Sequence, residues 1–477
     1  MSRWRHHYES GNILAKTAVR GTFLDFVDDP YKHVGNEEAA ARFQADGLLV
    51  IEDGVIVDFG AYDDIASKHE GVEITEIRDR IILPGFIDGH IHLPQTRVLG
   101  AYGEQLLPWL QKWVFPEEHR YAERSYAEEG TKHFFDNLLA SGTTTAQTFT
   151  TGSLTCNEVF FEEAARRNMR MIGGLTGIDT HVPDYFATTP EQFYADSSAL
   201  IEKWHGTGRA LYAITPRFAF GASTELMEAC RRLKEEHPDL WVNTHISENP
   251  AEIRGVLALH DDCTDYLGVY EKYGLVGPKF TGGHGVWLSN DEFRRFSDSG
   301  AAVAFCPSSN LYLGSGLFRL GRALDPERRV RIAYGTDMGG GNRFSMLNSL
   351  EDGYKVGMLN NTILDGSIVP SEQDLAESER NKLSPLRAFY SLTRGGAEAL
   401  YIDDFVGSFD IGKEADFVAL DWTAGPPATA WHQSLSYDGG AMTLETASDL
   451  LFGVMMVGDE RAVDQTWVAG ELAYQKA

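Results

Sequence analysis

Two histidines two residues apart give the first sign of chemistry in this chain. His90 and His92 stand in GFIDGHIHLPQ, and side chains two apart on a β-strand share one face. Two imidazoles that project together from a strand end suit a divalent metal ion. The same spacing also fits two exposed histidines at a strand end, so further ligands must be sought elsewhere in the chain.

Three other strand ends carry residues of the same kind. His245 in THISEN, His284 in GGHGVWLSNDE and Asp337 in IAYGTDMGGG each follow an apolar run. His245 and Asp337 would complete a site with the histidine pair and leave one position for water, as a catalytic metal requires. Each residue alone also fits a structural role, as a hydrogen-bonded histidine or a turn aspartate. Their shared placement at strand ends favours the metal site.

An acid–base residue is expected beside this metal. Glu248 follows His245 by three residues and can face a metal-bound water without being a ligand. Its carboxyl could take the proton of that water and deliver it to a ring nitrogen of the substrate. The sequence S-E-N-P is also typical of a helix start, where the helix dipole favours a glutamate. Glu248 could serve both as this helix-terminal residue and as the acid–base residue.

Three further residues suit a flat substrate. Arg217, at the end of ALYAITPRFAFG, stays protonated and can donate two parallel hydrogen bonds to a carbonyl or ring nitrogen. Phe218 offers a face for stacking, although a core position fits it nearly as well. Gln95 both donates and accepts, which suits the edge of a lactam. The fourth strand end carries no lysine of the kind that bridges two metals, so a single metal is expected.

These residues need a framework that brings many strand ends together. The middle of the chain alternates short apolar strands with helical stretches such as 158–168 and 223–237, the second preceded by a candidate cap, Ser223. The strand candidates are ILPGFIDGHIH, TTTAQTF, MRMIGGLT, ALYAITP, LWVNTHI, KFTGGHG, AAVAFCP and VRIAYGTD. Polar residues at their carboxyl ends favour a closed (β/α)₈ TIM-like barrel over an open, doubly wound α/β sheet.

Both ends of the chain differ from this middle. Residues 45–60 and the segments 416–421 and 464–475 alternate apolar runs with Gly turns, which predicts short antiparallel strands. Neither end alone has enough strands to close a core. We therefore expect 1–83 and 406–477 to form one small β-sandwich domain beside a metal-dependent barrel of residues 84–405. GSFDIGKE (407–414) lacks the hydroxyl of a phosphate loop and is expected to be a hairpin.

The amino-acid composition limits which cellular compartment and which binding partners are expected. Lys and Arg total 42 against 70 Asp and Glu, a net charge of −28, which repels phosphate backbones and anionic lipid. No nucleic-acid or membrane partner is therefore expected, and a small neutral substrate fits better. The four cysteines form no C-x-x-C pair and are expected to be reduced. No apolar leader stands in MSRWRHHYESGNILAKTA, so a cytoplasmic protein is expected.

The motifs together resemble the amidohydrolase superfamily and, within it, the zinc-dependent guanine deaminases of the barrel type. The resemblance covers nearly the whole chain and rests on PGFIDGHIHLPQ, LLPWLQKWVFPEE, TPRFA, THISEN, HGVWLSNDE, CPSSNLYLGSGLF, GTDMGGGNRFSML and GSFDIGKEADFVALD. It implies one zinc ion per chain, held by His90, His92, His245 and Asp337. It also implies that His284 and Asp337 position and help deprotonate the attacking water, and that Glu248 moves protons. Gln95, Arg217 and Phe218 would line the base pocket.

The resemblance implies hydrolysis of guanine to xanthine and ammonia, in purine salvage or breakdown, by a homodimer. Gly89 and Leu93 stand where the family motif PGFIDTHIHYPQ has Thr and Tyr, which removes no ligand but leaves the base preference open. A pterin, 8-oxoguanine or a triazine remains an alternative substrate, and iron an alternative metal. A non-catalytic binding protein and a metal-dependent ring amidase are the rivals from other classes.

Overall fold

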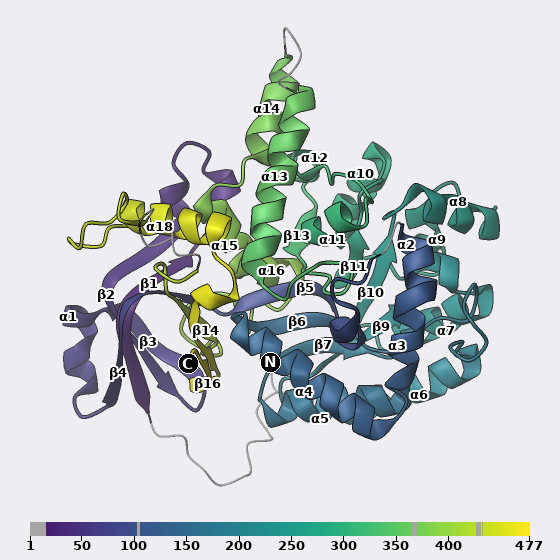
Figure 1. Ribbon diagram of the computed structural model, residues 1–477, viewed down its shortest axis with the longest axis horizontal. Helices are drawn as coiled ribbons and strands as arrows, with labels where there is room; N and C mark the ends of the chain where they lie inside the picture. The colour runs from purple at the N-terminus through teal and green to yellow at the C-terminus, as the bar shows by residue number, and fades with distance from the viewer. Residues whose placement is uncertain (1–15, 103–104, 365–369, 426–430, 432) are drawn as a thin grey trace.

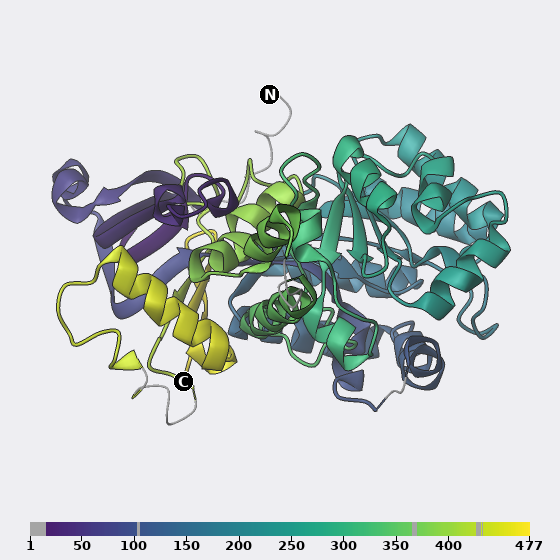
Figure 2. The same ribbon diagram turned by 90° about the horizontal axis from the view of Figure 1, so that it is seen from above.

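Eight parallel strands close almost completely into a barrel in the order in which the sequence predicts them. The computed structural model describes residues 16–102, 105–364, 370–425, 431 and 433–477 (Figures 1 and 2). Around the barrel the strands are β5 (Phe86–His92), β6 (Thr143–Phe149), β7 (Arg170–Gly174), β9 (Leu211–Pro216), β10 (Trp241–Ile246), β11 (Phe280–His284), β12 (Ala302–Phe305) and β13 (Arg331–Tyr334), with the short β8 (Thr176–Gly177) beside β9. The predicted barrel is confirmed.

A buried carboxylate joins the first strand to the segment after the last one. Asp88 Oδ1 accepts hydrogen bonds from the backbone N–H of His90 at 3.0 Å and of Thr336 at 3.1 Å, and Asp88 Oδ2 accepts from Thr336 Oγ1 at 2.5 Å. The backbone N–H of Asp337 donates to the His90 carbonyl at 2.8 Å. These bonds hold the two ends of the barrel together directly beneath His90 and Asp337.

Gly89 lets these two strands approach each other closely. A Cβ at position 89 would lie 2.5 Å from the Cβ of Ala333 and 3.1 Å from the carbonyl oxygen of Tyr334. Real Cβ contacts of 2.5 Å do not occur, so β5 and β13 could not keep this spacing around a larger residue. The departure from the family's threonine at this position is thus matched to the neighbouring strand.

Helices follow most barrel strands and surround the barrel in Figures 1 and 2. The helices of the described residues are α2 (Leu106–Trp109), α3 (Phe115–Arg120), α4 (Arg124–Ala140), α5 (Leu154–Arg166), α6 (Pro190–Trp204), α7 (Thr224–Glu236), α8 (Pro250–Leu259), α9 (Tyr266–Lys272), α10 (Asn290–Ser299), α11 (Pro307–Tyr312), α12 (Leu320–Ala323), α13 (Met346–Leu364), α14 (Glu372–Asn381), α15 (Pro385–Leu392) and α16 (Arg394–Ala399). Two more lie elsewhere: α1 (Tyr62–Ile65) packs against strands from the first part of the chain, and α18 (Leu444–Val457) packs against α13 and α15. Within the described residues, no helix combines the length and apolar character needed to cross a membrane.

Side-chain caps set where two predicted helices begin. Ser223 caps α7 as expected, because its Oγ accepts from the Leu226 N–H at 3.1 Å. The helix predicted at 158–168 instead begins at Leu154, since Ser153 accepts from the Cys156 N–H and starts the helix four residues earlier.

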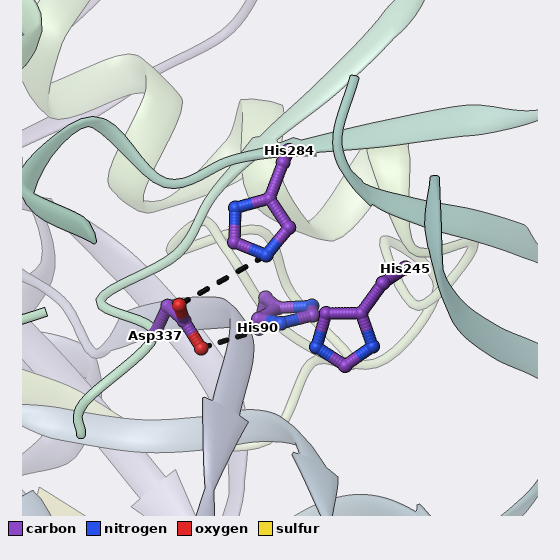
Figure 3. Close-up of side chains that lie close together, drawn as sticks. All are labelled: His90, His245, His284 and Asp337. Carbon is purple, nitrogen blue, oxygen red and sulfur yellow. Dashed lines mark ion pairs between the residues drawn. The ribbon is translucent and has the colours of Figure 1, made fainter. Parts of the chain in front are cut away.

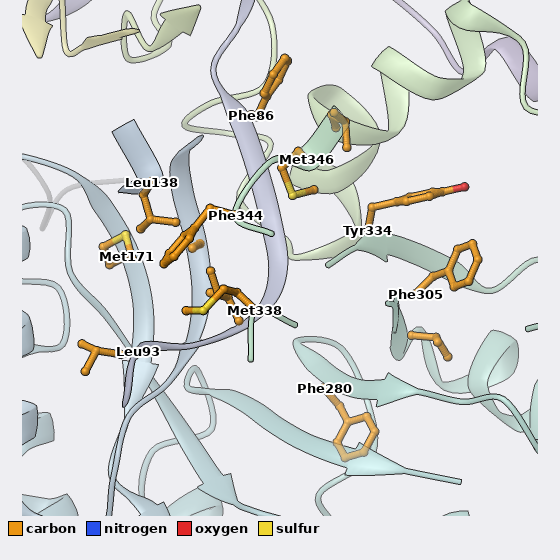
Figure 4. Close-up of a cluster of buried hydrophobic side chains, with 14 of the residues drawn as sticks. Phe86, Leu93, Leu138, Met171, Phe280, Phe305, Tyr334, Met338, Phe344 and Met346 are labelled. Carbon is orange, nitrogen blue, oxygen red and sulfur yellow. The ribbon is translucent and has the colours of Figure 1, made fainter. Parts of the chain in front are cut away.

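Large apolar side chains pack in the layer between the barrel strands and the helices outside them. Figure 4 shows part of this cluster. Phe86, Leu138, Met171, Phe305 and Tyr334 come from separate elements and are all almost fully buried. Burial of apolar area contributes about 25 cal/mol per Å², so this layer is a main source of the barrel's stability.

A second sheet combines strands from both ends of the chain. In sheet order its strands are β16 (Glu471–Gln475), β15 (Val463–Val468), β14 (Phe417–Leu420), β4 (Glu73–Pro84), β1 (Thr17–Phe26), β2 (Ala41–Glu52) and β3 (Val55–Ala61). β4 pairs parallel with β1 and antiparallel with β14, so the sheet is mixed. The predicted β domain, built from both ends of the chain, is therefore present as one mixed sheet. Its boundaries at 83 and 405 stay a prediction.

The turns of this sheet fall mostly where the sequence places them. Asp53 and Gly54 join β2 to β3, and Ala469 and Gly470 join β15 to β16, all four with positive φ. The hairpin predicted at 407–414 is wrong, because this segment consists of turns without a strand. Its backbone instead bonds to Ile56 at the start of β3.

A buried group of charges fastens the β sheet to the barrel. Arg209 donates to Glu414 Oε2 through Nε at 2.9 Å and to Asp416 Oδ2 through Nη2 at 2.5 Å. Arg170 donates to the same glutamate. Asp416 Oδ1 also accepts the Ala469 N–H at 2.8 Å, which ties in the turn between β15 and β16. Charges removed from water in this way are costly unless each keeps its partner.

We expect Asp416→Asn to lower the free energy of unfolding by about 3 kcal/mol, because it leaves part of the buried Arg209 charge uncompensated. Urea denaturation followed by circular dichroism measures this change. Asp298→Asn is the matched control, since Asp298 pairs with Arg294 on the exposed face of α10 and its loss should cost less than about 0.5 kcal/mol. Equal effects of the two substitutions would contradict a stabilising role for the buried charges.

Candidate metal and catalytic site

The five predicted metal-proximal residues converge at the carboxyl ends of the barrel strands. One ligand atom from each of His90, His245, His284 and Asp337 lies within 4.8 Å of the others (Figure 3). His92 is equally near, because its Nε2 lies 3.1 Å from His245 Nε2 and 3.2 Å from Asp337 Oδ1. His284 is thus close enough to be a metal ligand itself. That it positions the water instead of binding the metal stays a prediction.

The chemistry of this cluster fits a divalent metal. Four buried imidazole nitrogens of this cluster have no hydrogen-bond partner among the described residues: Nδ1 and Nε2 of His90, Nδ1 of His92 and Nε2 of His284. Burial lowers the pKa of His92 to about 3 and lowers the pKa values of His90 and His245, so these imidazoles are neutral and offer lone pairs. Imidazole nitrogens with one carboxylate and no thiolate suit zinc or iron.

Hydrogen bonds to the outer nitrogens orient two of the histidines. His245 Nδ1 lies 2.6 Å from the Arg217 carbonyl oxygen, which can only accept, so the proton is on Nδ1 and Nε2 is free to bind. His284 Nδ1 lies 2.9 Å from Asn310 Oδ1. The Nε2 of His284 then faces Glu248 Oε2 at 3.5 Å and Asp337 Oδ2 at 3.9 Å.

The backbone is strained at three positions of this site. Ser247, His284 and Asp337 have φ values of 50°, 71° and 44°, in the left-handed region that non-glycine residues seldom adopt. Such conformations cost about 1–3 kcal/mol each and persist where the surroundings hold them. Here they direct the His284 and Asp337 side chains into the barrel mouth.

Glu248 lies beside the metal cluster as an uncharged acid. It is 2% exposed, and Ser315 Oγ donates to its Oε1 at 3.0 Å. Burial, together with the charge of Asp337, raises the pKa of Glu248 to about 8, so it retains its proton near neutral pH. The helix start seen in the sequence belongs to the next residues, since Asn249 and Glu252 form the capping box of α8. Glu248 is left free for chemistry.

A cavity opens beside these groups. It is lined by His92, Gln95, Leu106, Trp109, Leu110, Arg217, Phe218, His245, Glu248, Glu252, His284, Leu313 and Asp337. One cavity therefore contains both the metal cluster and the three predicted base-binding residues, Gln95, Arg217 and Phe218. These three residues are called the base pocket below. Leucines and a tryptophan supply the apolar wall of the cavity, which suits a flat heterocycle.

Sequence reasoning missed several residues that hold the site in place. Glu118 accepts hydrogen bonds from both Arg217 and Gln95, while Ser315 and Asn310 hold Glu248 and His284. All three stand in the motifs LLPWLQKWVFPEE and CPSSNLYLGSGLF, whose residues received no roles. The available signal was that these two family-like motifs contain acidic and polar residues besides their apolar ones.

The fold and the site define the class of protein. The chain belongs to the amidohydrolase family, whose model matches residues 81–473. It is 43% identical to the guanine deaminase of Escherichia coli K12 over 465 residues, 96% of this chain and 98% of that protein. It is 37% identical to a probable guanine deaminase of Deinococcus radiodurans, over 91% and 93% of the two chains. The crystal structure of guanine deaminase from Bradyrhizobium japonicum is 68% identical, with a TM-score of 0.96 over 97% of this chain and 100% of that one.

We expect the purified protein to bind one divalent ion per chain at this site and to lose it in His92→Ala, which removes one of the converging nitrogens. Elemental analysis by mass spectrometry measures the ion. His133→Ala is the control, because His133 is exposed on α4 and does not belong to the metal cluster. Full metal content in His92→Ala would exclude His92 as a ligand.

Proposed function

We propose that this protein is a guanine deaminase that hydrolyses guanine to xanthine and ammonia, with one zinc ion per chain held by His90, His92, His245 and Asp337. The observation that carries the proposal is the shared cavity, which a protonated Glu248 lines together with the metal cluster and the base pocket. Full-length similarity to guanine deaminases of two bacteria supports the same substrate.

The base pocket suits the lactam edge of guanine. That edge presents a carbonyl acceptor, O6, next to an N–H donor, N1. Arg217 offers only donors and suits O6, whereas Gln95 can accept from N1–H. Phe218 provides a face for stacking against the ring. The net charge of −28 imposes no penalty on a neutral base of this kind.

The chain's own residues handle the protons of the reaction. Zinc bound here supplies a water activated at neutral pH. Glu248 donates its proton to N3, the ring nitrogen next to C2, so that negative charge does not build up on the ring as water adds to C2. Asp337 and His284 accept the proton of the attacking water and return it to the leaving amino group. Glu248 recovers a proton from the hydroxyl group on C2 as the C2 carbonyl forms, so water and guanine become xanthine and ammonia and the protein groups return to their starting protonation.

The same proposal extends to the setting of the enzyme. We infer a cytoplasmic homodimer that acts in purine salvage or breakdown, with zinc as its metal instead of iron. The strongly acidic composition and the free cysteines support a reducing compartment without nucleic-acid or membrane partners.

Ammonia release tests this proposal directly. We expect zinc-loaded protein to release ammonia rapidly from guanine and at least about 100-fold more slowly from adenine, because a site built to hydrogen-bond one ring edge rejects rings that lack it. Pterin, 8-oxoguanine and a triazine are the parallel substrates. Preference for one of them would keep the deaminase chemistry and change the base. No release from any ring would favour a binding protein.

We expect Glu248→Gln to lower kcat by about 10²–10⁴-fold while zinc content stays at the wild-type value, because the amide cannot donate an acidic proton and Glu248 is not a ligand. Steady-state kinetics and elemental analysis measure the two quantities. Glu225→Gln on the exposed first turn of α7 is the control. Loss of zinc together with activity would overturn the separation of acid and ligand.

A further inference from the structure

The two polar residues of the base pocket are held by one buried carboxylate that lies behind them. Arg217 Nη1 donates to Glu118 Oε2 at 2.7 Å, and Gln95 Nε2 donates to Glu118 Oε1 at 3.2 Å. The Glu118 side chain is fully buried and that of Arg217 is 2% exposed. These two bonds therefore form without competition from solvent, and each is a contact to a charged group.

This carboxylate determines which way the Gln95 amide points. A carboxylate only accepts, so Gln95 must turn its NH₂ group toward Glu118 and keep its Oε1 on the other side. Within the described part of the chain, that oxygen is buried without a hydrogen-bond partner, and it lies against Gly339, where an added Cβ would be 2.1 Å away. Gln95 lines the cavity, and Oε1 is its remaining acceptor.

Arg217 is fixed by the same contact and stays a donor. Nη1 is bonded to Glu118, which leaves the other guanidinium N–H groups for the cavity. The two residues thus present one acceptor and one set of donors, in a fixed arrangement. A ring edge must offer the complement, a carbonyl next to an N–H, to satisfy both.

We propose that Glu118 is a positioning residue that sets the hydrogen-bond pattern of the base pocket and so selects rings with a lactam edge. This inference rests on the proposed function. A ring whose edge nitrogen carries no hydrogen leaves the buried Gln95 oxygen unpaired, and this penalty produces the selectivity.

Local structure gives Glu118 and its neighbour different contacts. The chain enters α3 through one wider π-helical turn, Leu110–Val114. Glu117, the adjacent residue, is also largely buried but contacts different partners: Tyr126 Oη donates to its Oε1 at 2.5 Å, and Arg120 pairs with it. The chain therefore offers a matched control one position away from Glu118.

The test compares two bases that differ only at the edge in question. 2-Aminopurine keeps the 2-amino group of guanine but lacks O6 and the N1 hydrogen, and its fluorescence reports binding without turnover. Zinc-loaded Glu248→Gln protein is the background. Dissociation constants for 2-aminopurine come from direct titration, and those for guanine from competition.

In this background we expect Glu118→Gln to reduce the preference for guanine over 2-aminopurine by about 10–100-fold, because an amide at 118 lets Gln95 turn its NH₂ into the pocket. Zinc content should stay unchanged, Tm should fall because the buried Arg217 charge loses its partner, and Glu117→Gln should leave the preference at its starting value. A purely structural role for Glu118 would weaken both bases equally, and that result would overturn the proposal.

Two further results are possible: Glu118→Gln does not fold, or the starting protein shows no preference for guanine. If Glu118→Gln does not fold, Glu118→Asp carries the same test, since it keeps the charge but withdraws the carboxylate from Gln95. A smaller guanine preference is again expected, and an unchanged one would overturn the proposal. If the starting protein itself binds 2-aminopurine as tightly as guanine, the proposed function fails, and the role of Glu118 fails with it.

Discussion

The closure of the barrel by Asp88 is the contact on which the site depends. One buried carboxylate binds the backbone on either side of the seam, and the His90 carbonyl receives the N–H of Asp337. The histidine pair comes from the first barrel strand and the aspartate from the segment after the last one, and this seam sets their separation. The same contacts that close the barrel therefore also fix the relative positions of the candidate metal ligands.

Arg217 connects the two halves of the cavity. Its carbonyl oxygen orients His245 toward the metal cluster, while its guanidinium contacts Glu118 beside the base pocket. A shift of this residue would move a ligand and a recognition group together. Ser315 and Asn310 act in a similar way from the other side, since one short segment holds Glu248 and His284. The groups that would act on a substrate are thus supported by few backbone segments.

Much of this arrangement can be predicted from sequence because it follows from strand geometry. The period of two in a strand places His90 and His92 on one face, and parallel strands bring His245 and Asp337 to the same end of the barrel. The contacts of Glu118 do not follow from any such period. Its partner Arg217 is 99 positions away, and only the packing of α3 over the barrel mouth brings the two together. The contacts of the segment 407–414 do not follow from such a period either, since Glu414 pairs with Arg209, which is 205 positions away.

The order of strands in the second sheet has a consequence for how the chain folds during synthesis. β4 leads directly into the barrel, but its antiparallel neighbour β14 is made more than 300 residues later. Until then the edge of β4 presents unpaired backbone groups, which are a template for aggregation. The barrel strands can assemble as they emerge, whereas the sheet beside them stays half built until the last residues arrive. A ribosome stalled near the end of this message would therefore release a chain whose barrel strands are all present but whose sheet edge is open.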